Sequence, residues 1–366
     1  MTLPSEMHAV WLTGLGGLEK LEYRTDVPVP QAKDGEVLIR VAAAGVNNTD
    51  INTRIGWYSK AVSDATNNAG TTGFENASND DAGWAGTALS FPRIQGADIC
   101  GYIVAVGTGV APARIGERVI VRSMMPRPEP DRANECWTMG SECDGGFAQF
   151  TCAPARETYA VNSRWSDAEL ASIPCAYSTA ENMLHRAQLG PERVLVTGAS
   201  GGVGSAAVQL AKCRGAHVIA LCSPAKAQEV LDLGADQVID RNADLAVVLG
   251  EGSVDVVIDL VGGDQWPSLL GVLRRGGRYA VAGAIAGPIV PLDLRTLYLK
   301  DLTFLGCTFQ EDAVFANLIA RIEADQIRPV VARTYPLKDI AVAQVDFLEK
   351  AHTGKLVLVP PVPKTP

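Results

Sequence analysis

The sequence predicts an α/β protein that combines a doubly wound parallel sheet with a compact β-rich domain. Short runs rich in Val and Ile alternate with helical patterns over roughly residues 167–309, which is typical of a parallel sheet covered on both faces. A glycine-rich turn joins one of these runs to a helix, and the region before residue 160 carries β-like runs separated by Gly and Pro. A chain of 366 residues fits two domains, or three.

The first region, residues 1–160, is predicted to form the β-rich domain. Its strands are expected at residues 36–41, 99–106 and 118–122, which are apolar runs among Gly and Pro turn signals. Residues 59–90 differ, because Asn, Asp, Gly, Ala and Thr crowd this stretch. Trp57 and Trp84 argue against simple disorder, so we interpret the segment as an ordered excursion near a site.

The second region, residues 161–310, is predicted to form the doubly wound domain. Strands are expected at residues 193–197, 217–221, 238–240, 255–260, 278–282 and 303–306, with helices at 205–214, 225–233 and 266–274. The third region, residues 311–366, is predicted to hold helices at 312–324 and 338–351 and strands at 333–337 and 355–359. We interpret it as a return segment that completes the first domain.

Charge and composition exclude several classes of partner. Lys and Arg number 32 against 41 Asp and Glu, a formal charge of −9, and no run of basic residues appears, so nucleic acid is not an expected partner. No apolar stretch reaches the roughly 20 residues of a membrane span. The first residues lack the pattern of a signal peptide, and the eight cysteines are scattered, which favours free thiols and a cytoplasmic protein.

The most specific signal is a glycine turn between a buried strand and a helix, over residues 194–211. The glycines let a backbone approach a pyrophosphate, while the helix start supplies free N–H donors and the positive end of its dipole. The spacing is GxxGxxG, and the strand before it and the helix after it support a dinucleotide site. The predicted cofactor-binding residues of this turn are Gly198, Ser200, Gly201, Gly202, Val203 and Gly204.

The end of the next strand indicates which dinucleotide binds. An NAD site places Asp or Glu there to hold the ribose 2′-hydroxyl, but this sequence has Cys222 and Ser223. Ser223 can donate a hydrogen bond to a 2′-phosphate, and Lys226 and Arg241 can neutralise it, which predicts NADPH. The alternative is that these two cations are ordinary solvated surface charges.

Two further turns are expected to contact the cofactor. Leu260 and Val261 follow the fourth strand of the predicted sheet, and Ala282 and Gly283 follow the fifth. A doubly wound sheet binds its ligand at the carboxyl ends of the strands, where these residues fall.

With these motifs, the chain resembles the medium-chain dehydrogenase/reductase superfamily. The resemblance rests on residues 35–41, 45–47, 107–119, the glycine turn and residues 354–358. It implies a GroES-like β-rich catalytic domain, interrupted by a Rossmann domain, with the active site in the cleft between them. It also implies a homodimer, or a dimer of dimers, joined through the edges of the Rossmann sheets.

The superfamily includes zinc enzymes, and the resemblance implies that this chain is not one of them. The position of the first zinc-binding Cys is Asn47, and the Gly-His-Glu stretch reads Gly-Ala-Asp at residues 96–98. Only Cys175 of the three ligands remains, and a catalytic zinc needs three protein ligands. The lobe that carries four cysteines in that branch has only Cys136 and Cys143 here, so no metal site is predicted, although a chance metal or redox pair at these two cysteines stays open.

The remaining likeness is to the zinc-independent quinone-oxidoreductase-like branch. It implies that Asn47 and Tyr58 are catalytic, that Thr179 contacts the nicotinamide side of the cofactor and that Lys355 lies at the domain junction. A second tyrosine of that branch is replaced by Asn52. The segment 59–90 is a further departure, expected at the mouth of the cleft.

The predicted activity is hydride transfer from NADPH to a quinone or an α,β-unsaturated carbonyl. Without a metal, hydrogen bonds from Asn47 and Tyr58 would stabilise the developing oxyanion, and Tyr58 or solvent would deliver the proton. Tyr58 can equally be a cleft-wall aromatic with no proton role. Two other functions stay open: a metal-free alcohol or aldehyde oxidoreductase, and an NADPH-binding redox sensor without turnover.

Overall fold

A six-stranded parallel sheet organises the second region of the chain. The computed structural model describes residues 3–127, 132 and 135–363. The sheet has the order β13-β12-β11-β14-β15-β16, and every neighbouring pair is parallel. Its strands are β11 (Arg193–Val196), β12 (His217–Cys222), β13 (Gln237–Asp240), β14 (Val254–Asp259), β15 (Leu273–Val281) and β16 (Thr303–Gly306). The predicted doubly wound sheet is therefore confirmed.

Helices cover both faces of this sheet because successive strand residues alternate between the faces. Val194 and Val196 pack into the core on one face, and Leu195 packs into the core on the other. The first face carries α3 (Pro174–Arg186), α4 (Gly202–Lys212) and α5 (Ala227–Asp232), and α9 (Asp312–Glu323) packs against α3. The short helix α2 (Asp167–Ala171) instead packs on the β-rich sheet of the first region. The second face carries α6 (Leu245–Leu249), α7 (Trp266–Val272) and α8 (Leu294–Leu299).

Some predicted boundaries were wrong. Helix α4 begins at Gly202 rather than at residue 205, because Gly201 is extended and acts as its N-cap. The helix expected to end at residue 274 ends at Val272, and Leu273 already pairs with Val254 in the sheet. In both cases the tertiary contacts of the turn outweigh helix propensity, which is a weak local preference.

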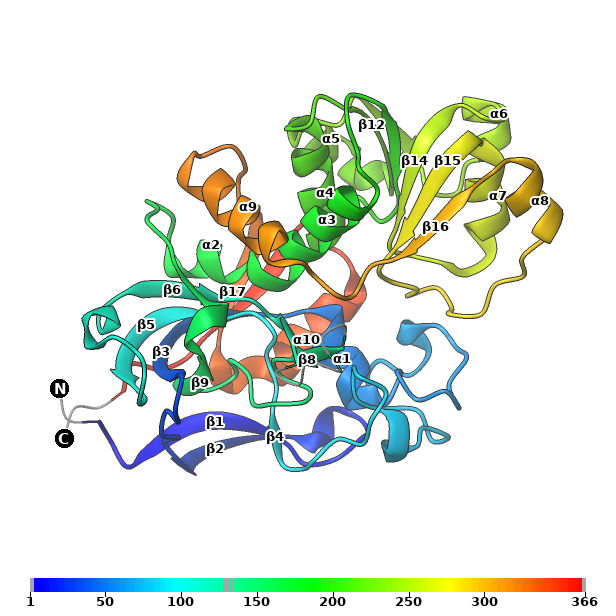
Figure 1. The fold of residues 1–366 in the computed structure, drawn as a ribbon. Helices are drawn as coiled ribbons and strands as arrows, with labels where there is room; N and C mark the ends of the chain where they lie inside the picture. The colour runs from blue at the N-terminus through cyan, green and yellow to red at the C-terminus, as the bar shows by residue number, and fades with distance from the viewer. Residues whose placement is uncertain (1–2, 128–131, 133–134, 364–366) are drawn as a thin grey trace.

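A second, mostly antiparallel sheet forms the β-rich part of the molecule. Its order is β10-β6-β5-β3-β18-β17, and β9 also pairs with β3. The strands are β3 (Glu36–Gly45), β5 (Cys100–Val106), β6 (Arg118–Val121), β9 (Phe150–Pro154), β10 (Thr158–Ala160), β17 (Val331–Pro336) and β18 (Lys355–Val359). Figure 1 shows β17 and α10 (Ile340–Glu349), near the C-terminal end of the colour scale, beside the blue and cyan strands. The chain end thus returns to the first region, with Val357 opposite Gly45.

Smaller elements complete this part. They are β1 (Glu6–Leu12), β2 (Leu21–Pro28) and β4 (Arg93–Ile94) in one sheet, β7 (Met124–Pro126) and β8 (Cys136–Thr138) in another, and the helix α1 (Asn48–Ile55). Residues 59–90 hold two 3-10 turns, Thr66–Asn68 and Asn79–Asp81, and the Thr66 backbone N–H donates to the Ile285 carbonyl at 3.1 Å. The excursion therefore contacts the loop after β15. In the described part of the chain, no helix combines the length and hydropathy that crossing a membrane requires.

Candidate functional site

A cavity of about 230 Å³ lies where the two parts of the molecule meet. Helix α1 and the return segment line it from one side, and the glycine turn and the ends of β14 and β15 from the other. Thirteen of the predicted site residues line it together: Asn47, Tyr58, Thr179, Gly198, Gly201, Gly202, Val203, Gly204, Leu260, Val261, Ala282, Gly283 and Lys355. Residues separated by more than 300 positions in the sequence thus meet in one cleft.

The glycine turn packs so closely on its neighbours that side chains at Gly202 and Gly204 would clash. A Cβ on Gly204 would lie 2.2 Å from the Gly198 carbonyl oxygen, and one on Gly202 would lie 2.7 Å from Cδ of Lys355. The N–H of Gly201 bonds to the Gly198 carbonyl, and that of Ser205 bonds to the Gly201 carbonyl. The backbone N–H groups between them begin α4 and have no intrahelical partner, so they can receive an anion.

A buried carboxylate holds the loop after β14 in place. Asp259 is fully buried and accepts from the Thr197 hydroxyl at 2.7 Å, from the backbone N–H of Val261 at 3.0 Å and from the Tyr279 hydroxyl. The Thr197 hydroxyl in turn accepts from the Leu260 N–H at 2.9 Å. The sequence placed Asp259 inside a strand without a role, because two partners of its side chain, Thr197 after β11 and Tyr279 in β15, are distant in the chain.

Asn47 sits in a buried polar network rather than free in the cavity. Its Nδ2 donates to Asp98 Oδ2 at 2.8 Å and, more weakly, to the Gly45 carbonyl at 3.4 Å. Its Oδ1 accepts from the Lys355 ammonium, which also donates to Asp98 Oδ2 at 2.8 Å. Asp98 Oδ1 accepts from the Cys175 N–H at 2.6 Å, so the carboxylate binds three donors.

A second carboxylate supports the start of α1. Asp50 Oδ2 accepts from the Asn47 backbone N–H at 2.7 Å, and its Oδ1 from the Ala97 N–H at 3.3 Å. Burial raises the pKa of Asp50 to about 7, although its hydrogen bonds and the Lys355 charge act in the opposite direction. Asp50 therefore ties the backbone of Asn47 to the segment that carries Asp98.

Tyr58 stands between two tryptophans at the cavity wall. Its ring packs edge-to-face on Trp57 at 5.5 Å and on Trp84 at 4.9 Å between centroids. Its hydroxyl donates to the Thr49 hydroxyl at 3.1 Å, and burial raises the pKa of the phenol above its usual range. At neutral pH, Tyr58 is therefore a protonated donor. Trp84 belongs to the excursion at residues 59–90 and also lines the cavity.

Helix α3 contributes two small polar side chains to the cavity. The Thr179 hydroxyl donates to the Cys175 carbonyl at 2.7 Å, which leaves the lone pairs of its oxygen as acceptors. Burial is the main cause that raises the pKa of the Cys175 thiol, and the Asp98 charge adds to it. Cys175 is therefore a neutral thiol at neutral pH.

Five predicted cofactor residues lie outside the cavity lining: Ser200, Cys222, Ser223, Lys226 and Arg241. The Ser200 carbonyl accepts from the Gly354 N–H at 2.9 Å, which joins the glycine turn to the return segment. Cys222 is buried at the end of β12, and Arg241 is exposed after β13. The Lys226 ammonium donates to the carbonyls of Lys350 and His352, both at 2.6 Å.

Sequence reasoning missed a lysine that lines the cavity. The Lys350 Nζ lies 3.8 Å from the Phe347 ring centroid and 3.4 Å from Asn48 Oδ1, its single hydrogen bond within the described residues. Burial and the nearby Lys226 charge lower its pKa to about 7. Lys350 is the C-cap of α10, with a positive φ of 53°, and its side chain lines the cleft. Nothing in the local sequence pattern separates it from a surface lysine.

Comparison with known proteins agrees with this geometry. Residues 33–163 match the alcohol dehydrogenase GroES-like domain, and residues 202–324 match the zinc-binding dehydrogenase model. The chain is 30% identical to the quinone oxidoreductase of Lama guanicoe over 96% of this chain and 97% of the relative. It is 28% identical to an NAD-dependent alcohol dehydrogenase of Sulfurisphaera tokodaii over 97% and 100%. A crystal structure from Sinorhizobium meliloti, provisionally described as an alcohol dehydrogenase, is 47% identical over 98% of both chains, with a TM-score of 0.86.

The chain belongs to the medium-chain dehydrogenase/reductase superfamily. Within it, the likeness extends to the quinone-oxidoreductase-like branch. The expected GroES-like and Rossmann architecture is confirmed by the two matched models and by the sheet order. Oxidoreductases of this superfamily use a nicotinamide cofactor, and the glycine turn supplies the matching anion site.

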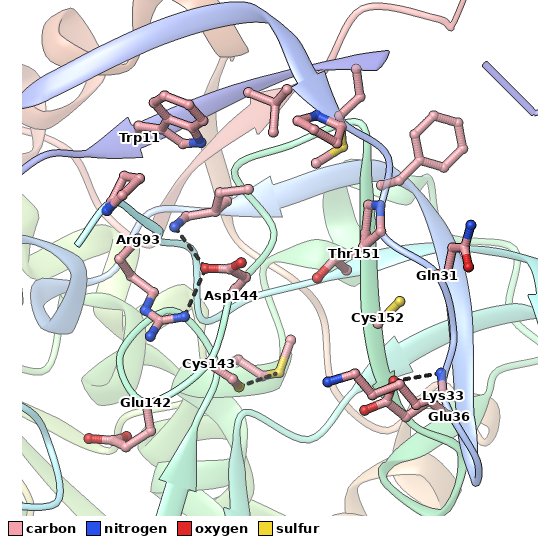
Figure 2. A pocket seen from close by; sticks show the side chains of 18 of the residues that line it. Trp11, Gln31, Lys33, Glu36, Arg93, Glu142, Cys143, Asp144, Thr151 and Cys152 are labelled. Carbon is pink, nitrogen blue, oxygen red and sulfur yellow. Dashed lines mark hydrogen bonds and ion pairs between the residues drawn. The ribbon is translucent and has the colours of Figure 1, made fainter. Parts of the chain in front are cut away.

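A second cavity lies in the GroES-like part, away from this site. Figure 2 shows its side chains, among them Trp11, Arg93 and Asp144. The Arg93 guanidinium donates to Asp144 at 2.9 Å, and Glu36 accepts from the Lys33 backbone N–H at 2.9 Å. None of the predicted site residues lines it. Arg93 and Asp144 neutralise each other, and Glu142 accepts from the backbone N–H groups of Ala85 and Thr138. No group of three potential metal ligands occurs there or elsewhere in the described ranges.

Proposed function

We propose that this member of the superfamily transfers a hydride from NADPH to a quinone or an α,β-unsaturated carbonyl without a metal. The observation that carries the proposal is one apolar cleft that combines the helix start of the glycine turn with the neutral phenol of Tyr58 and the Asn47–Lys355 pair. When bound, the nicotinamide supplies the hydride. The chain has to bind and orient both reactants and stabilise the charge that develops on oxygen.

The residues of the cleft suit a dinucleotide. The free N–H groups at the start of α4 would hold the pyrophosphate, and Lys350 offers a nearby cation. The turns at Leu260 and Val261, fixed through Asp259, and at Ala282 and Gly283 would flank the nicotinamide side. The Thr179 oxygen is placed as an acceptor for the carboxamide of the cofactor.

NADPH is favoured over NADH by the end of β12. Cys222 and Ser223 offer no carboxylate to hold a ribose 2′-hydroxyl, and Lys226 and Arg241 place positive charge beside them. Asp240 lies opposite Cys222 in the sheet, but its Oδ1 accepts from the Asn242 N–H at 3.0 Å. The Lys226 ammonium uses two of its three donors on carbonyls, which leaves one for a phosphate.

The substrate oxygen would be stabilised by hydrogen-bond donors. Tyr58 keeps its proton at neutral pH and can donate it in place of its bond to Thr49. One amide hydrogen of Asn47 is held only by the 3.4 Å contact with the Gly45 carbonyl, so a ligand oxygen near it could share that hydrogen while the other stays on Asp98. Trp57 and Trp84 give the pocket flat apolar walls, which fit a planar unsaturated substrate.

Two alternatives keep specific support. Relatives described as alcohol dehydrogenases favour alcohol or aldehyde chemistry, which here would lack a Lewis acid to polarise the carbonyl. An NADPH-binding sensor without turnover would need only the glycine turn and the cleft. Aldehydes and enones compared as substrates separate the two enzymes, and the absence of any turnover would favour the sensor.

The deciding experiment follows NADPH oxidation at 340 nm with a panel of quinones and enones. We expect turnover that prefers NADPH over NADH and survives EDTA, and that falls by at least tenfold in Tyr58→Phe if the phenol delivers the proton. Aldehydes and an enzyme-free mixture are the controls. Activity that is lost in EDTA and restored by zinc would contradict the metal-free mechanism.

We also propose that the protein forms a homodimer in the cytoplasm. Strand β16 pairs on one side only within the described sheet, and the adjoining Leu294 and Tyr298 are 64% and 61% exposed. A second copy joined along β16 would cover these side chains. All eight cysteines are free thiols, which supports a reducing compartment.

A further inference from the structure

Four side chains from different parts of the chain converge beneath the cleft. Asn47 precedes α1, Asp98 precedes β5, Cys175 lies in the first turn of α3 and Lys355 begins β18. All four are nearly inaccessible to solvent: Asp98 is 0% exposed and Lys355 is 3% exposed. Three of these positions correspond to the zinc-binding stretches of related enzymes, and one of the family models that match this chain is described as zinc-binding.

The donor set at this place does not fit a zinc ion. Zinc binds thiolate, imidazole and carboxylate, whereas here there is only one sulfur ligand, one carboxylate and one amide. The carboxylate is already bonded to an ammonium group, at 2.8 Å from Lys355 Nζ to Asp98 Oδ2. A zinc ion bound to Asp98 would lie next to the Lys355 ammonium, because both would contact the same carboxylate. Two cations this close repel each other strongly in a buried site.

We propose that the Lys355 ammonium replaces the metal as the internal cation of this site and, with Asp98, positions Asn47 for the reaction. It supplies the single positive charge that neutralises Asp98. It also donates to Asn47 Oδ1, while Asp98 accepts from Asn47 Nδ2. An ammonium group cannot accept a hydrogen bond and a carboxylate cannot donate one, so only one orientation of the Asn47 amide satisfies both neighbours. Lys355 is thus a positioning residue, and this role rests on the proposed function.

The buried ion pair between Asp98 and Lys355 also affects the free energy of unfolding. A buried ion pair costs desolvation free energy on both charges, and removal of one partner leaves the other uncompensated. Lys355→Met should therefore be more harmful to folding than the joint removal of both charges in Asp98→Asn/Lys355→Met. This non-additivity is a property of the folded chain and does not depend on any substrate.

The first test separates positioning from mere structure. We compare wild type with Lys355→Met, Lys355→Arg and Asp98→Asn/Lys355→Met, and measure cofactor affinity by fluorescence, turnover, and thermal unfolding. We expect Lys355→Met to lower kcat by at least tenfold while the cofactor Kd changes less than threefold, and Lys355→Arg to recover part of kcat. We also expect a higher Tm for the double variant than for Lys355→Met. Equal losses in Kd and kcat, or a double variant less stable than the single one, would overturn the positioning role.

The second test asks directly whether the ammonium stands in the place of a metal. Asn47→Cys adds a second thiol beside Cys175 and Asp98, which makes three potential zinc ligands. With Lys355 present, this variant should retain less than 0.1 zinc per chain after dialysis, whereas Asn47→Cys/Lys355→Met should retain about one. Metal content by mass spectrometry and the thiolate-to-cobalt absorption band report this without turnover.

Each result of the metal test decides the proposal. Stoichiometric zinc in Asn47→Cys with Lys355 intact would overturn it, and so would the failure of the double variant to bind zinc or cobalt. Wild type without quinone or enone turnover would count against the proposed function alone, because metal content and unfolding do not depend on the substrate. The two hypotheses can therefore fail separately.

Discussion

Three lysines of this protein show how the same residue type can take different roles. Lys355 is buried against Asp98 and Asn47, and Lys226 donates to two backbone carbonyls. Lys350 contacts Phe347 and a single amide oxygen, so its ammonium is the least compensated of the three. The hydrogen-bond partners of each ammonium group, and not the residue type, decide which lysine can bind a phosphate.

The titration of Lys350 leads to a prediction about cofactor binding. Its pKa is about 7 in the free protein against 10.5 for an ordinary lysine, so the folded chain binds fewer protons than the unfolded chain between these values. The stability of the free protein should therefore rise with pH across this window. A pyrophosphate beside Lys350 favours the charged form, so binding should take up a proton near pH 7 and weaken as pH rises.

We test this by titration calorimetry with NADH, which lacks the 2′-phosphate and its own titration. The Kd of the wild type should rise from pH 6.5 to pH 8.5. Lys350→Met should bind on the order of tenfold more weakly at pH 6.5 and with a shallower pH dependence, because Asp50, whose pKa is also about 7, still titrates in this range. His352, with a pKa lowered to about 4 by burial, is neutral throughout this range. Lys33→Met, in the other cavity, is the matched control. Parallel pH profiles in wild type and Lys350→Met would rule Lys350 out as the binding cation.

At the scale of elements, the excursion at residues 59–90 forms part of the wall of the cleft. Its Trp84 packs against the Tyr58 ring. Its Thr66 N–H donates a hydrogen bond to the Ile285 carbonyl on the Rossmann side of the cleft. Its tryptophans led to the prediction of an ordered segment near a site, and Trp84 does line the cavity. Its path could not be predicted, because its few regular turns are held by contacts with distant loops.

This arrangement predicts that Trp84 selects substrates by size. Trp84→Ala should raise the KM for a naphthoquinone roughly two- to tenfold, which is the expected loss of an aromatic edge-to-face contact. The KM for a small aliphatic enone should change less, because such a substrate reaches less of the wall. Steady-state kinetics with both substrates provide the measurement, and Trp84→Phe, which keeps an aromatic edge, is the control. An equal change for both substrates would mean that Trp84 acts on the fold and not on recognition.

At the scale of the whole molecule, the site exists because the chain end returns to its beginning. Gly354 joins the glycine turn through the Ser200 carbonyl, and β18 pairs with β3 just before Asn47. These links fix the two halves of the cleft relative to each other. The predicted domain boundaries at residues 160 and 310 stay a prediction.

The proposed dimer gives a prediction at the same scale. Leu294→Glu and Tyr298→Glu place charge on the apolar surface beside β16, so each should convert a dimer at about 10 μM into a monomer. Light scattering after gel filtration measures the mass. Val247→Glu, at a site that is 81% exposed on α6, should leave the dimer intact. A monomeric wild type, or Leu294→Glu and Tyr298→Glu variants that remain dimeric, would show that this edge is not the interface.

The sequence by itself determined the parallel sheet and the glycine turn, because strand periodicity and turn chemistry are local and repeat along the chain. Its resemblance to known enzymes, carried by motifs, indicated the superfamily. It also brought Asn47, Tyr58 and Lys355 forward as site residues. Only the tertiary structure decided that Lys355 bonds to Asn47 and Asp98, that Lys226 donates to two carbonyls and that Lys350 lines the cleft. The physical reason is that the state of a buried charge depends on its partners, and here those partners lie up to 308 residues away in the chain.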